Sequence, residues 1–165
     1  YSEYGRFGCF STFYRHRPFE FVFPAEFFDL EPVKIAFAEK AIMLCKASFF
    51  GDSEIYDKIL NAKTPKEAKR LGRCVKDFSE DLWEEFREYF AFEILKAKFS
   101  SDNRMRETLL STGTAVLAEA TVNDNLWGIG LDIDDPDVFY PERWRGQNVL
   151  GTVLMRVRQH FQEVQ

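Results

Sequence analysis

The chain has 165 residues, a formal net charge of -5 and 18 phenylalanines. That length is most economically one domain with a single substantial core, to which the phenylalanines contribute. The acidic balance excludes a general duplex-binding surface, which would normally be a basic stripe, so any contact with nucleic acid is expected to be local. The three cysteines lie far apart and only two histidines accompany them, which predicts no metal site and no disulfide framework.

The chain is expected to be soluble and intracellular, either cytoplasmic or nuclear, with no membrane contact. No stretch reaches the roughly 18 apolar residues of a membrane span, and the N-terminus does not read as a signal peptide. We expect no cofactor. The oligomeric state is left open by the sequence.

The N-terminal part predicts two short strands followed by a central helix. Phe19–Phe23 alternates apolar and polar positions, and Gly8 to Tyr14 is rich in aromatic residues. From Val33 to Phe50 few polar positions occur on any side, which is typical of a helix buried nearly all round.

Capping signals predict the remaining helices. The first of these helices is capped by Asp52 or Ser53 and runs through Leu60, and the second opens with the capping box Thr64-Pro65-Lys66-Glu67 and is ended by Gly72 as a C-terminal glycine. A long helix follows from Asp77-Phe78-Ser79-Glu80 to about Phe99. The last two run from Asp102 to Gly113 and from the cap Asn148 to about Val164. Residues 116–121 are a strand or an extended segment. The expected fold class is α+β and predominantly helical, with residues 1–165 in a single compact domain that holds a buried central helix and a few short strands.

An acidic stretch lies between residues 132 and 145. It contains Asp132, Asp134, Asp135 and Asp137, but Pro136 stands where an EF-hand needs its third side-chain ligand, and the turn glycine is absent. The pattern therefore favours a solvated acidic loop over a metal site.

Two glycine-containing turns predict a binding site in the second half of the chain. The first, Val122 to Leu131, places Asp124 and Trp127 beside Gly128, and the second, Trp144 to Gly151, opens a helix. Glycines let a ligand approach the backbone, an indole offers a stacking face, and a helix N-terminus attracts anions. We expect a nucleotide diphosphate to bind amides near Gly128 or Gly146. The alternative for Asp124 is an Asx-turn.

The predicted central helix carries one carboxylate and one ammonium on a single apolar stripe, Glu39 and Lys46, seven positions apart. Both side chains could simply extend past their neighbours to the surface. If Lys46 is desolvated, its pKa falls, and the neutral amine becomes a nucleophile for the anomeric carbon of a sugar, with Glu39 moving protons.

Two further residues have both a structural and a functional interpretation. Trp83 lies one turn into the long helix, where a tryptophan usually belongs to the core. Arg73 follows Gly72, where it either holds a phosphate or complements the helix C-terminus. Arg145 is the other candidate for a phosphate.

The order of these motifs resembles the NADAR family of YbiA-like N-glycosidases. The resemblance covers nearly the whole chain and rests on Ala38 to Ala47, Leu71-Gly72-Arg73, Asn123-Asp124, Trp127-Gly128-Ile129-Gly130 and Gly146-Gln147-Asn148-Val149-Leu150-Gly151. The family's usual Phe-Ser-Asn-Phe is Phe10-Ser11-Thr12-Phe13 here, so a hydroxyl replaces the asparagine amide of that pattern. The central helix also lacks the Glu-His-Tyr version found in some bacterial members.

The resemblance implies hydrolysis of an N-glycosidic bond. The matching functional positions are Glu39, Lys46, Trp83 and Asp124, with Gly128 and Asn148 near the ligand. The implied activity is removal of ADP-ribose from ADP-ribosylated guanine, in guanosine or in DNA, by an imine on Lys46. The alternatives are the same cleavage on a phosphoribosyl intermediate of riboflavin synthesis, and a non-catalytic module that binds ADP-ribose.

Overall fold

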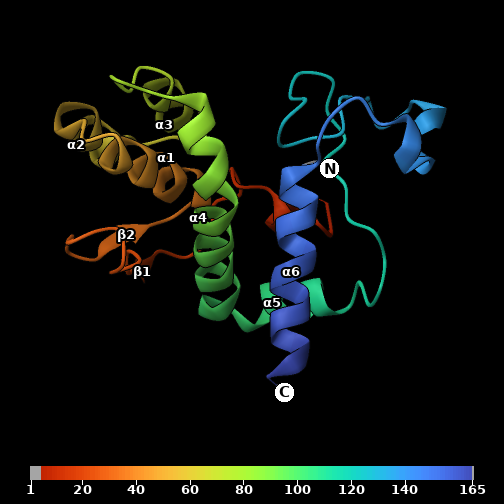
Figure 1. Cartoon of the computed structure of the whole chain (residues 1–165). Helices are drawn as coiled ribbons and strands as arrows, with labels where there is room; N and C mark the ends of the chain where they lie inside the picture. The colour runs from red at the N-terminus through yellow and green to blue at the C-terminus, as the bar shows by residue number, and fades with distance from the viewer. Residues whose placement is uncertain (1–4, 165) are drawn as a thin grey trace. The chain divides into compact units, whose positions relative to one another are not determined.

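The computed structural model describes residues 5–164 and shows an α+β fold that is predominantly helical. Its described part contains six α-helices, a two-stranded sheet and three short 3-10 turns (Figure 1). The predicted fold class is confirmed. The chain divides into two compact units. One comprises Ser11–Asp102, and the other joins Asn103–Gln165 to the N-terminal segment that ends at Phe10.

The unit Ser11–Asp102 is built around the predicted central helix. It contains strands β1 (Phe19–Phe21) and β2 (Val33–Ile35), which pair antiparallel, and helices α1 (Ala38–Phe49), α2 (Ser53–Asn61), α3 (Pro65–Gly72) and α4 (Glu80–Ser101). Helix α1 packs against α2, α3 and α4, and β1 also contacts α4 (Figure 1). Eight of its twelve residues are buried, which agrees with the all-round apolar pattern.

The boundaries at the N-terminal end differ from prediction in two places. Val33–Ile35 forms β2 and not the first turn of the central helix, which begins at Ala38. Val33 and Ile35 are β-branched residues that pair with β1, where Phe19 lies opposite Ile35. The aromatic stretch from Gly8 is no strand either, because Gly8–Phe10 is a buried 3-10 turn.

The predicted caps hold α2 and α3, and α4 is capped by Ser79 within the predicted opening sequence Asp77–Glu80. The side chain of Asp52 accepts a hydrogen bond from the Ile55 amide, Thr64 accepts from Glu67, and Ser79 accepts from Leu82. Each satisfies an amide that lacks a partner within its helix, which stabilises the helix by about 1 kcal/mol.

Gly72 ends α3 as predicted, and it also allows close packing. Helix α3 ends at Gly72, and the capping residue Arg73 has ordinary right-handed torsions. A Cβ atom on Gly72 would lie 2.0 Å from Sδ of Met43 on α1. The absence of a side chain therefore lets α3 approach α1 closely.

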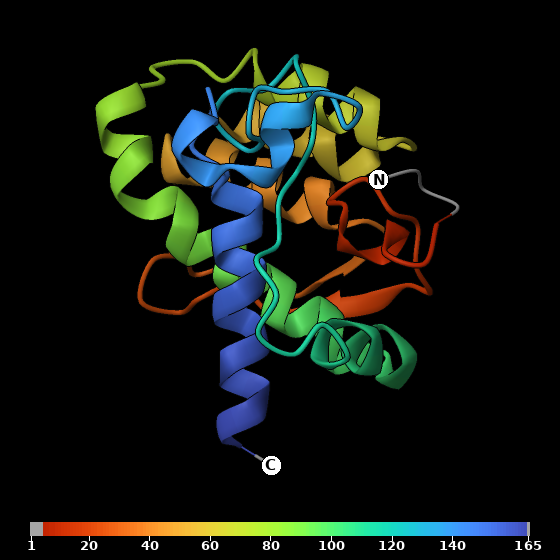
Figure 2. The same cartoon turned by 90° about the vertical axis from the view of Figure 1, so that its right-hand side faces the viewer.

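The other unit contains α5 (Asn103–Leu110), the 3-10 turns η2 (Pro136–Phe139) and η3 (Pro141–Arg143), and α6 (Val149–Glu163). Helices α5 and α6 contact each other. Residues 116–121 are extended without forming a strand and run beside α6 (Figure 2). Within residues 5–164, no helix is both long and apolar enough to cross a membrane.

Candidate active site

Lys46 lies in the last turn of α1, with a half-buried side chain. Desolvation by burial lowers the pKa of this lysine, nearby Glu80 opposes that change, and the positive charge of Arg73 adds to it. The desolvation expected from the sequence is therefore present. The Nζ atom lies 3.8 Å from the ring centroid of Phe78, a contact that the sequence analysis did not anticipate.

Glu39 lies in the first turn of α1 and is 6% exposed, so it does not extend to the surface. Its carboxylate accepts a 2.8 Å hydrogen bond from the hydroxyl of Thr12. The Glu39 amide donates to the Thr12 carbonyl at 2.9 Å. Thr12, which replaces the family's usual asparagine, therefore holds both the backbone and the side chain of Glu39.

The Thr12 segment is itself anchored from α4. Lys98 is fully buried, and its Nζ donates to the carbonyl oxygen of Ser11 at 2.9 Å. The Ser11 hydroxyl accepts from the Phe13 amide. These contacts place the Thr12 hydroxyl in front of Glu39, so the carboxylate has a defined orientation.

Replacing Thr12 by valine is expected to lower turnover by about 10-fold to 100-fold. Valine keeps the shape of threonine but removes the hydrogen bond to a buried side chain, and leaving such a buried group unsatisfied costs about 1–3 kcal/mol. Steady-state kinetics of the purified variants measures the effect. Thr12→Ser should restore most of the activity, because it restores the hydroxyl. Equal turnover in the valine variant and the wild type would show that the contact is unimportant for Glu39.

Trp83 is buried in a cluster of aromatic rings. It is 5% exposed and stacks on Phe90 with centroids 5.6 Å apart, and the rings of Phe49 and Phe50 also lie against it. This placement supports the core interpretation, and a ligand contact by Trp83 stays a prediction. Arg73 is exposed at the C-terminal end of α3, where both of its predicted interpretations remain open.

Asp124 forms the Asx-turn that the sequence analysis named as the alternative. Its Oδ1 accepts hydrogen bonds from the amides of Leu126 and Trp127, at 3.1 and 2.8 Å. The carboxylate is thus bound to the start of the glycine turn, where Trp127 directly precedes Gly128 and has a half-buried side chain. A catalytic role for Asp124 stays a prediction.

The two glycine turns bind each other through their backbones. The amides of Gly146, Gln147, Asn148, Val149 and Leu150 donate to the carbonyls of Ile129, Asn125, Gly128, Leu126 and Trp127, respectively, and the Gly128 amide donates to Asp124. Each of these donors already has a protein acceptor, which does not favour a diphosphate at these amides, and the predicted diphosphate site stays a prediction. Gly128 and Gly146 permit close approach of protein backbone.

A Gly146→Ala substitution is expected to destabilise the protein by about 1–3 kcal/mol, the usual cost of overpacking. The added Cβ would lie 2.2 Å from the backbone oxygen of Gly128, which has no freedom to rotate away. Urea unfolding measures the change. Gly113→Ala is the control, because Gly113 has a φ of +58° but no atom within 4 Å of an added Cβ, so its loss is backbone strain alone. A smaller loss at Gly146 than at Gly113 would contradict the packing argument.

Asn148 occupies the predicted N-cap position of α6, but its side chain does not cap the helix. The residue has a φ of +54°, a left-handed conformation that asparagine tolerates. Its Nδ2 donates to the Leu117 carbonyl, and its Oδ1 accepts from the Glu119 amide. Asn148 therefore fastens the extended segment 117–119 to the start of α6, and a ligand contact stays a prediction.

The acidic stretch has local structural contacts. Asp132 and Asp135 accept hydrogen bonds from the amides two residues later, and Asp137 pairs with Arg143 at 2.7 Å. Among residues 5–164, no group of three or more histidine, cysteine or acidic side chains has an arrangement that could hold a metal ion.

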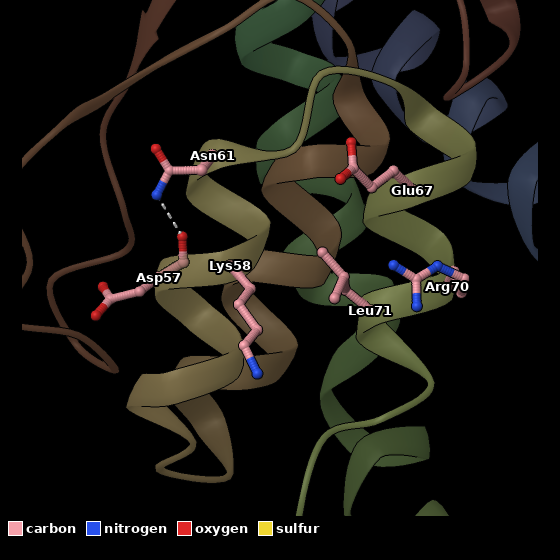
Figure 3. Close-up of a pocket in the computed structure, with 6 residues that line it drawn as sticks. All are labelled: Asp57, Lys58, Asn61, Glu67, Arg70 and Leu71. Atoms are coloured by element: carbon pink, nitrogen blue, oxygen red, sulfur yellow. Dashed lines mark hydrogen bonds between the residues drawn. The ribbon is translucent and has the colours of Figure 1, made fainter.

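Among the pockets formed by residues 5–164 are three that each lie within one unit, and the predicted catalytic residues line none of these three. The pocket in Figure 3, of about 420 Å³, lies between α2 and α3. Its charged residues are mostly exposed and of mixed sign, and Asn61 bonds the carbonyl of Asp57 on its own helix. The other two are an apolar pocket beside α6 that includes Phe7 and Leu154, and a polar one at the start of α2. None offers a charge pattern selective for a nucleotide.

Two residues that contact the predicted catalytic side chains, Thr12 and Phe78, were missed as site residues. Thr12 had a signal in its departure from the Phe-Ser-Asn-Phe pattern. Phe78 had none, because it was visible only as part of a helix-opening sequence. Each comes from a segment remote in sequence from α1.

A half-buried lysine and a buried glutamate therefore lie on one core helix, and these are residue types that can serve as nucleophile and proton-transfer group. A model of the NADAR domain matches residues 1–162, and the chain belongs to this family. N-glycosidase R617 of Acanthamoeba polyphaga mimivirus is 34% identical over 76% of this chain and 74% of that protein. Riboflavin biosynthesis protein VVA0006 of Vibrio vulnificus is 30% identical over 72% of this chain, which spans only 29% of that protein.

A solved structure supports the same fold. The NMR structure of the Escherichia coli protein YbiA matches with a TM-score of 0.73 and 27% sequence identity, over 99% of this chain and 83% of that chain. The family resemblance expected from the motifs is therefore confirmed, and several named relatives are N-glycosidases.

Proposed function

We propose that this protein is an N-glycosidase that removes ADP-ribose from ADP-ribosylated guanine, in guanosine or in DNA. The observation that carries the proposal is the desolvated amine of Lys46 on the same core helix as the buried carboxylate of Glu39. An amine with a lowered pKa is more often neutral near pH 7, and the neutral form is the nucleophile. The names of the relatives support cleavage of an N-glycosidic bond.

The proposed reaction begins when the lone pair of the Lys46 amine forms a bond to the anomeric carbon. The bond from that carbon to guanine breaks, and the base leaves with the electron pair and takes a proton from a carboxylic acid. Glu39 is the proposed donor, and a proton-transfer role for Asp124 is proposed from the family motif alone. Loss of a proton from nitrogen and opening of the sugar ring then form an imine. Water cleaves this imine, releases ADP-ribose and restores the amine.

Recognition of the substrate is proposed to rest on side chains, since the amides at Gly146–Leu150 have protein acceptors. Arg73 is exposed and close enough to lower the pKa of Lys46, which suits a guanidinium that contacts a phosphate near the reacting sugar. Arg145 is exposed as well.

A second candidate is cleavage of a phosphoribosyl pyrimidine. It is favoured by the riboflavin biosynthesis protein of Vibrio vulnificus among the relatives, although this chain spans 29% of that protein. The same Lys46 and Glu39 chemistry would apply, because only the leaving base and the phosphate pattern differ.

The deciding experiment incubates the purified protein separately with ADP-ribosylated guanosine and with a phosphoribosylaminopyrimidine. Chromatography then measures the free base and the free sugar. Release of ADP-ribose from the first substrate alone supports the proposal, and release from the second alone supports the alternative. Binding of ADP-ribose in calorimetry without turnover of either substrate would show a non-catalytic module and overturn both.

A further inference from the structure

The ring of Phe78 lies directly over the amine of Lys46. Its centroid is 3.8 Å from Nζ, well inside the range of about 6 Å over which an aromatic face attracts a cation. Phe78 belongs to the segment between α3 and α4, whereas Lys46 belongs to α1. The contact therefore joins two separate elements of the same unit.

Three features hold the ring in this position. Asp77, the preceding residue, has a φ of +52°, a left-handed conformation that persists only where the surrounding structure imposes it. Ser79, the following residue, is the N-cap of α4. The ring itself meets Phe50 edge to face, with centroids 5.2 Å apart. The backbone and one neighbouring ring therefore both fix Phe78.

We infer that Phe78 is a positioning residue for Lys46, whose ring holds the resting ammonium and releases it when the amine becomes neutral. The ring face attracts a cation but has no comparable attraction for an uncharged amine. Loss of one proton from Nζ, to water or to a carboxylate, exposes the lone pair and weakens the contact with the ring in the same step. The release of the neutral amine from the ring during the reaction rests on the proposed function, whereas the contact between the ring and the resting ammonium does not.

Charged groups around Lys46 come from two further elements. Arg73 at the end of α3 disfavours the ammonium, and Glu80 in α4 favours it. Glu80 also forms an ion pair with the buried Arg87, whose Nη1 lies 2.8 Å from Oε1 of Glu80. The Glu80 carboxylate therefore interacts with both Arg87 and Lys46. Burial of Lys46 disfavours the charged form and lowers its pKa. The ring acts in the opposite direction, so removing it should lower that pKa further.

The test without substrate measures the pKa of Lys46 by competitive acetylation. Wild type and variants are labelled with acetic anhydride across a range of pH, and peptide mass spectrometry reads Lys46. Phe78→Leu keeps an apolar side chain and removes the aromatic face, so the pKa of Lys46 is expected to fall by about 0.5–1 pH unit. Phe78→Trp keeps an aromatic face and should leave the pKa of Lys46 at or above its wild-type value.

Phe92→Leu is the matched control. Phe92 lies 5.3 Å from Nζ of Lys96 on α4, so the same substitution removes a ring from a different lysine and should leave Lys46 unchanged. An unchanged pKa of Lys46 in folded Phe78→Leu protein would overturn the inference. If that variant does not fold, a fall in the pKa of Lys46 in the tryptophan variant would overturn it instead.

The second test uses ADP-ribosylated guanosine. In Phe78→Leu the rising limb of kcat against pH should move to lower pH by the amount measured by labelling. If labelling shows a lowered pKa of Lys46 but the rising limb of kcat against pH stays at its wild-type position, the release step is contradicted. Absence of turnover in the wild type would refute the proposed function and leave the substrate-free result to decide the contact between Phe78 and Lys46.

Discussion

Lys46→Arg is expected to reduce turnover by at least about 10³-fold, the scale seen when a covalent nucleophile is removed. Arginine keeps the positive charge and the stacking on Phe78, so the fold and the local electrostatics should be maintained. A guanidinium does not deprotonate in proteins and so cannot supply the neutral amine. Borohydride added during turnover should also reduce the imine in the wild type and leave the sugar attached to Lys46 as a secondary amine.

Lys40→Arg is the matched control for this experiment. Lys40 lies on the same helix, and its pKa is lowered by desolvation as well, but its Nζ donates to the Leu60 carbonyl. Its replacement should leave turnover near the wild-type value and borohydride trapping on Lys46 intact. Normal turnover in Lys46→Arg, together with no adduct on Lys46 in peptide mapping, would refute the imine route. Attack by water activated by Glu39 or Asp124 would then be preferred.

Asp124→Asn is expected to reduce turnover by about 10² to 10⁴ while the protein stays folded. The structure makes this substitution selective. Oδ1 of an asparagine can still accept hydrogen bonds from the amides of Leu126 and Trp127, so the turn is kept while the carboxyl group is lost. Steady-state kinetics with ADP-ribosylated guanosine and urea unfolding give the two readouts.

Asp135→Asn provides the comparison for Asp124. Asp135 also accepts a backbone amide through Oδ1, from Asp137 at 2.9 Å, and it lies in the acidic stretch with no predicted catalytic role. Turnover in that variant should stay within a few-fold of wild type. If Asp124→Asn also retained near-normal turnover, Asp124 would be a turn residue only, and proton transfer would have to be assigned to other groups.

Local signals in the sequence predicted most of the helices. Asp52, Thr64 and Ser79 each bond an amide three residues further along the chain, so their caps depend on a few neighbouring residues. The apolar stripe of the central helix left open whether Glu39 extends to the surface or takes part in chemistry, and the structure shows that its side chain is buried. The order of the motifs was sufficient to identify the family and to single out Glu39 and Lys46, the two side chains of α1 on which the proposed chemistry rests.

Contacts between distant segments decided the rest. Val33–Ile35 became a strand because β1 supplies its hydrogen-bonding partner, and Asn148 bonds residues 29 and 31 positions away in place of capping α6. The amides of residues 146–150 donate to carbonyls of residues 125–129, a pairing that the glycine pattern alone did not indicate. Phe78 and Thr12 contact Lys46 and Glu39 from other elements of their unit. Sequence patterns report which groups a segment offers, whereas backbone pairing and side-chain contact depend on which segment folds against it, and only the tertiary structure determines that.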